Sequence, residues 1–241
     1  MATLSRCASA LVLVLLSATL VQANTIPLDA TYRGWYQANA GDAGYHDSSY
    51  TDYFAGVWIS GTTSEYRNFF VFDLSGIGND QEITGATLQL ETYGGSIGTE
   101  TFGLFDVMTP ISSLIVSGNN RGLTFWDLGG GTAYGSIDIT KTADNQYTSQ
   151  TISIPLTAAF IAAANTARGG QLGLGGAITI PVTTPHSNEY EFLYMEADPS
   201  MPPMSASQLI LTTMPVPEPS TILLLATGII GLLVRVRRKR G

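Results

Sequence analysis

Short runs of alternating hydrophobic and polar residues fill the middle of the chain, a pattern that predicts β-strands. In Ile83–Thr92, Leu88 and Leu90 fall on one side and polar residues on the other, as in a half-buried strand. Tyr66–Leu74 is instead apolar at successive positions, which predicts a central strand covered on both faces. Its two apolar sides are Phe70, Phe72 and Leu74, and Phe69 and Val71.

The same pattern and the intervening turn residues predict about ten short strands in all. One alanine-rich helix is expected at Thr157–Ala167, with Thr157 as N-cap and an apolar face of Phe160, Ile161 and Ala164. We therefore predict a mainly β fold, an antiparallel β-sandwich of jelly-roll-like form with one short helix. A β-helix is the alternative, but no fixed internal repeat is found. The further expected strands are Thr101–Met108, Tyr134–Thr140, Thr151–Ile154, Leu172–Ile180, Tyr190–Met195 and Gln208–Thr212, and Ile111–Val116 is a further short apolar stretch.

The first 23 residues have the features of a secretory signal peptide. Arg6 gives a positive start, Ala10–Leu16 is apolar, and Val21–Ala23 ends in a small residue at the usual cleavage position. An uncleaved N-terminal anchor is the alternative. The single cysteine, Cys7, lies in this segment, so residues after 23 contain no thiol or disulfide. The exported domain is expected at residues 24–213.

A second apolar segment follows that domain. Residues 214–220 form a proline-rich linker, 221–236 a predicted transmembrane helix and 237–241 a basic cytoplasmic tail. The uncharged run Thr221–Val234 spans only about 21 Å as a helix, short of the ~30 Å bilayer core, which suits a temporary anchor. A buried core helix is the alternative. The cations that would orient the segment are Arg235, Arg237, Arg238, Lys239 and Arg240.

Charge is divided unevenly along the chain. Residues 24–219 carry all 19 acidic residues and only five cations, a net charge of −14, although the whole chain is at −8. Such a domain repels phosphate backbones, so nucleic acid is not expected as a partner. The acidity also serves solubility, which is the simpler interpretation.

Aromatic residues are concentrated in the segment 32–58, where short loops rich in Gly and Asp interrupt them. Exposed rings of this kind stack on sugars, and we name Trp35, Tyr36, Trp58 and Trp126 as candidate glycan-binding residues. The competing interpretation is that most of the rings fill a sandwich core. The Asp spacing matches no calcium loop. The aromatics of the segment are Tyr32, Trp35, Tyr36, Tyr45, Tyr50, Tyr53, Phe54 and Trp58.

The sequence offers little evidence for catalysis. His46 and His186 have no metal-ligand partner at a recognisable spacing, and no Gly-x-Ser-x-Gly motif occurs. A polysaccharide-active enzyme using two carboxylates remains an alternative, but no pair stands out. Surface histidines and solvated carboxylates are the simpler interpretation. We expect no enzyme, metal or cofactor.

Two resemblances add to these predictions. Residues Arg67–Tyr93 are similar to a strand–loop–strand segment of secreted β-sandwich modules related to carbohydrate-binding domains. The order Pro217-Glu218-Pro219, an apolar segment and an Arg/Lys cluster resembles the PEP-CTERM sorting signal, whose motif is also labelled an ice-binding-protein C-terminal domain. That resemblance implies export by a Gram-negative bacterium and recognition of Pro217, Glu218 and Pro219 by the membrane protease exosortase. It also implies inner-membrane anchoring before processing, and a place at the cell surface or in an exopolysaccharide biofilm matrix.

Three hypotheses for the domain follow. The first is a structural or interaction protein of the exopolysaccharide matrix. The second is a carbohydrate-binding module of the same fold, and the third is a polysaccharide-active enzyme.

Overall fold

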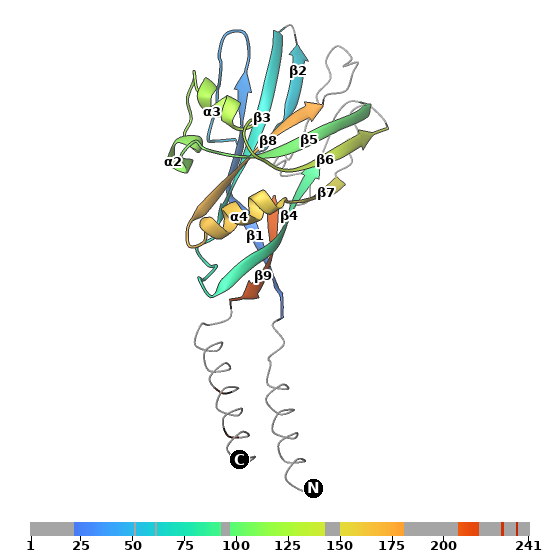
Figure 1. Ribbon diagram of the computed structural model, residues 1–241. Coiled ribbons are helices and arrows are strands. Elements are labelled where there is room, and N and C mark those ends of the chain that lie inside the picture. Colours follow the sequence, from blue (N-terminus) through green and yellow to red (C-terminus); the bar gives the residue numbers. More distant parts are fainter. Residues whose placement is uncertain are drawn as a thin grey trace.

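The computed structural model describes residues 22–50, 52–60, 62–92, 97–142, 150–180 and 207–216, together with Gly228 and Arg235. Antiparallel strands dominate this part of the chain, and three short helices accompany them (Figure 1). The elements are β1 (Asn24–Ala38), β2 (Gly56–Ser60), β3 (Thr62–Asp73), β4 (Gln81–Thr92), β5 (Gly98–Asp106), α2 (Ile111–Leu114), α3 (Gly122–Asp127), β6 (Ala133–Lys141), β7 (Gln150–Pro155), α4 (Ala158–Thr166), β8 (Gln171–Ile180) and β9 (Gln208–Pro215).

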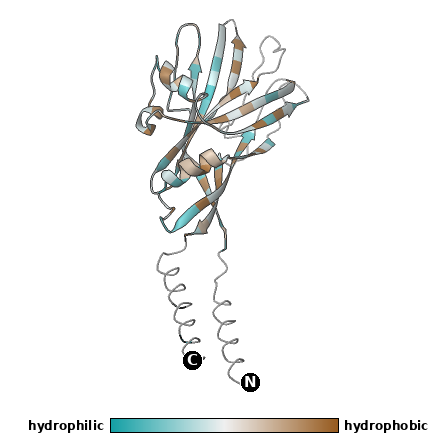
Figure 2. Ribbon diagram, viewed as in Figure 1, coloured by the Kyte–Doolittle hydropathy of each residue, from teal (hydrophilic) through white to brown (hydrophobic). Residues whose placement is uncertain are grey.

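The strands follow one path, in the order β6-β5-β8-β3-β1-β9-β4-β7, and this path folds into two layers. Sheet A contains β7, β4, β9 and the first part of β1, and sheet B contains the second part of β1 with β3, β8, β5 and β6. Strand β2 forms a hairpin with the first half of β3. Hydrophobic and hydrophilic residues alternate along the strands, as a two-layer arrangement requires (Figure 2).

Strand β1 passes from one layer to the other. Asn24–Asp29 pair with β9, whereas Ala30–Ala38 pair with β3. The register shifts between Ala30 and Tyr32, so a bulge at this point bends the strand between the sheets. Pro27 lies in the first part, where β1 is the edge of sheet A and a missing N–H costs no ladder hydrogen bond.

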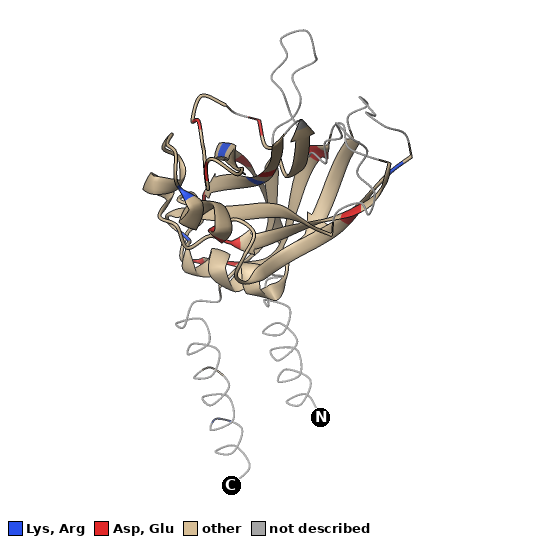
Figure 3. Cartoon of the chain, turned by 90° about the horizontal axis from the view of Figure 1, so that it is seen from above, with Lys and Arg blue, Asp and Glu red and all other residues tan. Residues whose placement is uncertain are grey.

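Among the charged side chains of the described residues, Glu91, Glu100 and Lys141 are buried. Acidic and basic residues are dispersed over the molecule, and the basic ones are few (Figure 3). Arg67 forms an ion pair with Glu65 at 2.9 Å. Most of the buried side chains are apolar, so the fold is held mainly by burial of apolar surface.

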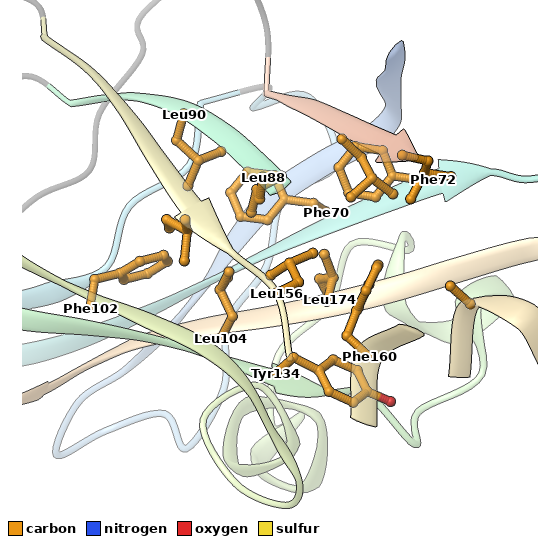
Figure 4. Close-up of a cluster of buried hydrophobic side chains, with 14 of the residues drawn as sticks. Phe70, Phe72, Leu88, Leu90, Phe102, Leu104, Tyr134, Leu156, Phe160 and Leu174 are labelled. Atoms are coloured by element: carbon orange, nitrogen blue, oxygen red, sulfur yellow. The ribbon is translucent and has the colours of Figure 1, made fainter. Parts of the chain in front are cut away.

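The main core lies between the two sheets. Sheet B contributes Phe70, Phe72 and Leu104, and sheet A contributes Leu88 and Leu90, all with almost no exposed surface (Figure 4). Helix α4 packs Phe160 and Ala164 into the same core, with Phe160 edge-on to Tyr134 at a centroid distance of 5.4 Å. These contacts join elements that are far apart in the sequence.

The outer face of sheet B carries a second, smaller core. Phe69 and Val71 pack there under helices α2 and α3, with Leu114, Phe125 and Leu128. Gly175 of β8 allows this layer to approach closely, because a Cβ at Gly175 would lie 2.5 Å from the carbonyl oxygen of Leu128. Strand β3 is thus covered on both faces.

Most of the predicted architecture is confirmed. The fold is mainly β, antiparallel and sandwich-like, and Tyr66–Leu74 is apolar on both faces as expected. The prediction of a single helix is wrong, since Ile111–Leu114 and Gly122–Asp127 are also helical. Thr157 is the N-cap of α4, but its hydroxyl donates to the carbonyl of Ala133 and does not cap the helix.

Several predictions concern residues that the structure does not describe. These include nearly all of the signal peptide, the strand at 190–195, the motif at 217–219, and the apolar segment and its cations apart from Gly228 and Arg235. Among the described residues, no helix is long and apolar enough to cross a membrane.

Candidate functional site

A pocket opens on the inner face of sheet B, at the end of the sheet where β1, β3 and the β2–β3 hairpin lie together. On β1, Trp35 pairs with Asn68 and so shares the face of Phe70, whereas its neighbour Tyr36 pairs with Arg67 and lies on the opposite face. Tyr66 of β3 lies on the same inner face as Trp35. This part of the inner face holds an aromatic cluster around Trp35.

Eight described residues line the pocket, which has a volume of about 330 Å³. Six of them are aromatic and two are polar. Tyr45 is held beside β1 by a pair of backbone hydrogen bonds with Gln37, at 2.7 and 2.8 Å, and the β2–β3 hairpin places Trp58 opposite Ser64. The lining residues are Trp35, Gln37, Tyr45, Tyr50, Asp52, Phe54, Trp58 and Tyr66.

Trp35 is the centre of this aromatic cluster. Tyr50 stacks on it at a centroid distance of 5.5 Å and an interplanar angle of 15°. Tyr66 and Phe54 approach edge-on at 5.3 and 5.5 Å, and Tyr45 is tilted at 6.2 Å. Such contacts favour fixed ring orientations, so the pocket wall is preorganised. Tyr50 remains 47% exposed and forms part of the open side.

Two polar side chains interrupt the aromatic lining. The indole N–H of Trp35 donates to Asp52 Oδ1 at 3.0 Å, which fixes both side chains. The amide nitrogen of Gln37 donates to Ser64 Oγ at 2.8 Å, so its carbonyl oxygen is the group that can accept a further hydrogen bond. The amide of Gln37 also has a second N–H, so the two residues offer a ligand the acceptor oxygens of Asp52 and Gln37 and one donor of Gln37.

Arg33 lies two residues before Trp35 on the same face of β1. Its guanidinium lies 5.8 Å from the ring centroid of Tyr53 and interacts with the charges of Asp52 and Asp29. Burial lowers the pKa of Arg33, and the neighbouring Tyr53, Asp52 and Asp29 oppose this effect. Arg33 itself does not line the pocket.

The phenol of Tyr45 stays protonated at neutral pH. Desolvation raises its pKa, and the carboxylate of Asp47 and the nearby Tyr50 act in the same direction. Its hydroxyl lies 3.4 Å from Asp47 Oδ2. Asp47 also accepts from the backbone N–H of Ser49 at 2.9 Å, a local turn that leads the chain toward Tyr50.

Tyr36 and His46 lie on the other side of sheet B. Tyr36 is fully buried, and its hydroxyl donates to the carbonyl of Leu114 at 2.8 Å. His46 stacks on Tyr36 at 4.7 Å, and its Nδ1 lies 2.8 Å from the carbonyl oxygen of Trp35. The expectation of a surface histidine is wrong for His46, which is only 2% exposed. Burial lowers its pKa.

Trp126 lies away from the pocket. It is 58% exposed on helix α3, and the guanidinium of Arg67 stacks on its ring at 4.7 Å. Arg67 is on the outer face of sheet B, whereas the pocket is on the inner face. Of the four candidate glycan-binding residues, the structure thus brings together Trp35 and Trp58 and places Tyr36 and Trp126 elsewhere.

The sequence indicates the aromatic segment but does not single out most of the residues that line the pocket. Tyr45, Tyr50 and Phe54 belong to that segment, whereas Tyr66 was assigned only to a strand. Adjacent residues of a strand point to opposite faces of the sheet, so a strand assignment for this segment would have placed Trp35 and Tyr36 on different faces. Within the described ranges, no three His, Cys, Asp or Glu side chains gather closely enough to hold a metal ion.

Comparisons with known proteins identify the segment after the domain. None of the curated proteins compared resembles the chain in sequence. Among solved structures, the K1 cleaved adhesin domain of Lys-gingipain from Porphyromonas gingivalis W83 is 10% identical, over 81% of this chain and 99% of that one. Its TM-score of 0.24 is too low to support any argument. Residues 215–239 match the PEP-CTERM protein-sorting motif, which implies export, exosortase processing and a membrane-anchored C-terminal segment before processing.

Proposed function

We propose that the exported domain is a non-catalytic interaction module of the cell surface or extracellular matrix, and that it binds carbohydrate in the aromatic pocket. The observation that carries this proposal is the pocket itself, with six aromatic rings and two polar side chains around about 330 Å³. Together with the sorting motif, it supports a role in an exopolysaccharide or biofilm matrix. A Gram-negative inner membrane would hold the protein before exosortase releases it.

The chemistry of the lining suits a sugar ring. A pyranose has apolar C–H faces that pack on aromatic rings, and its hydroxyls donate to acceptors such as Asp52 and Gln37. The rings around Trp35 are already ordered by their mutual contacts, so little conformational entropy is lost on binding. The pocket volume is at the lower end of small-ligand sites, which favours one or two sugar units.

The position of the pocket fits a tethered protein. Val216, which immediately precedes the Pro-Glu-Pro sequence, donates its N–H to the carbonyl of Asp80, beside the start of β1. Trp35 lies 11 residues further along β1 than Asn24, which is about 36 Å at ~3.3 Å per residue. The pocket therefore lies far along the domain from Val216, and β2, which supplies the lining residue Trp58, lies at the opposite end of the domain from β9 (Figure 1). A polysaccharide can reach it before or after processing.

The enzyme hypothesis has less support from the pocket. Hydrolysis by two carboxylates needs a pair about 5 to 10 Å apart across the scissile bond. Asp52 is the one carboxylate among the eight described lining residues. We therefore keep binding without turnover as the proposal.

A glycan array and a co-sedimentation assay with matrix exopolysaccharide test it, using the full exported protein. The proposal predicts saturable binding with quenching of tryptophan fluorescence. A purely structural matrix protein would bind none of these glycans, and that result would overturn the carbohydrate-binding part. Release of sugar fragments during the assay would contradict the non-catalytic part.

A further inference from the structure

We infer that the pocket selects its sugar by charge, and favours residues that carry an ammonium group over neutral sugars and over uronic acids. This inference rests on the proposed function, since it assumes that the pocket takes a sugar. It names the class of ligand that the lining suits best: an amino sugar with a free, protonated amine.

The first observation is the carboxylate of Asp52. It lines the pocket, and the indole N–H of Trp35 holds it in place at 3.0 Å. A fixed carboxylate forms a strong, charge-assisted hydrogen bond with an ammonium group. The same carboxylate repels the anionic group of a uronic acid.

The second observation is the number of aromatic faces around this carboxylate. Trp35, Tyr50, Phe54, Trp58 and Tyr66 all line the same pocket. The face of an aromatic ring carries partial negative charge and attracts a cation within about 6 Å of its centroid. Aromatic rings and a carboxylate thus act on a bound ammonium group in the same direction.

The third observation is the balance of charges around the pocket. None of the eight described lining residues is Lys or Arg. The positive charge of Arg33 partly offsets the negative charge of Asp52. Asp47, whose carboxylate lies beside the Tyr45 hydroxyl, adds a second negative charge near the pocket. None of the domain's other four cations lines the pocket. Arg67 stacks on α3, Arg121 donates to the carbonyl of Ser113, Lys141 is buried on β6, and Arg168 donates to the carbonyl of Gln81. An anionic sugar would therefore find no cation in the described lining.

The test compares three oligosaccharides of equal length with the full exported protein. Their sugars carry a free amine, an N-acetyl group or a carboxylate, and titration calorimetry is run at a pH where the amine is protonated. We expect the amine form to bind roughly three- to thirtyfold more tightly than the N-acetyl form, and the carboxylate form to bind most weakly. The preference should shrink in high salt.

The decisive variant is Asp52→Asn, which keeps an oxygen to accept from Trp35 but removes the charge. It should lose the preference, so that the amine and N-acetyl oligosaccharides bind with similar affinity. Asp138→Asn is the control, because Asp138 is an exposed residue of β6 outside the pocket lining, and it should keep the preference.

The outcomes separate the two claims. Equal binding of the three oligosaccharides, or an unchanged preference in Asp52→Asn, overturns charge selection but leaves the proposed function standing. No binding of any oligosaccharide overturns both. Tetramethylammonium is a further probe, and if it binds as tightly as the amine oligosaccharide, the pocket recognises a free organic cation and not an amino sugar.

Discussion

Tyr53→Phe removes one hydroxyl that ties the segment with the pocket residues Asp52 and Phe54 to the edge of sheet A. The hydroxyl of Tyr53 donates to the carbonyl of Glu91 at 2.9 Å and accepts from the N–H of Glu91 at 3.0 Å. Both bonds lie beyond Gln89, the last β4 residue that pairs with β9, so the tyrosine replaces a missing strand partner. Tyr53 itself is fully buried.

The expected cost follows from this geometry. Without the hydroxyl, two buried backbone groups lose their partner, and each such loss costs about 1–3 kcal/mol. We expect the variant to lose about 3 kcal/mol of unfolding free energy, which corresponds to a melting temperature roughly 6–12 °C lower for a domain of this size. Burial raises the pKa of Tyr53, so the hydroxyl is present across the neutral pH range and the effect should not depend on pH there.

Differential scanning calorimetry or urea unfolding followed by tryptophan fluorescence measures this loss. Tyr134→Phe is the matched control, since Tyr134 packs in the main core and its hydroxyl makes no hydrogen bond within the described residues. That variant should change stability by less than about 0.5 kcal/mol. If both variants have the same stability, the hydroxyl of Tyr53 does not act as a strand partner and the reasoning is refuted.

Three further predictions concern other parts of the domain. The folded-state pKa of His46 lies below its ordinary 6.5, so on acidification the unfolded chain binds a proton before the folded protein does. The free energy of unfolding should therefore fall as the pH drops below about 6.5. Urea unfolding of His46→Asn at a series of pH values should show no such fall from this residue. Gly175→Ala brings a Cβ 2.5 Å from the Leu128 carbonyl and should cost about 1–3 kcal/mol, whereas Gly173→Ala, with 3.6 Å to its nearest neighbour, should be tolerated in thermal melts. Mass spectrometry of the released protein should find its last residue at Val216 or beyond, because β9 is paired up to that point; a product lacking part of β9 would contradict this.

The sequence was most informative where side-chain period and burial agree. Leu88 and Leu90 alternate with polar residues on β4, and Phe69 to Phe72 face two cores on β3, as predicted. Strand β1 was not predicted, because Pro27 and Gly34 are unfavourable in strands. Pairing with β9 and β3 outweighs that local preference.

The pocket could be predicted only in part. A dense aromatic segment was visible in the sequence, but core and surface rings have the same composition. Which ring belongs to which face depends on register, and Trp35 and Tyr36 are adjacent residues with opposite surroundings. The contact between Asp52 and Trp35 depends on where a loop returns to the sheet, and no local pattern specifies it.

The most direct test of carbohydrate binding in the pocket is the affinity of two tryptophan variants for the best oligosaccharide. Trp58→Ala removes a lining ring, whereas Trp126→Ala removes an exposed ring on the opposite face of sheet B. We predict a loss of about 2 kcal/mol, roughly thirtyfold in Kd, for Trp58→Ala and less than about twofold for Trp126→Ala. Equal affinities, or a larger loss for Trp126→Ala, would contradict the proposed site.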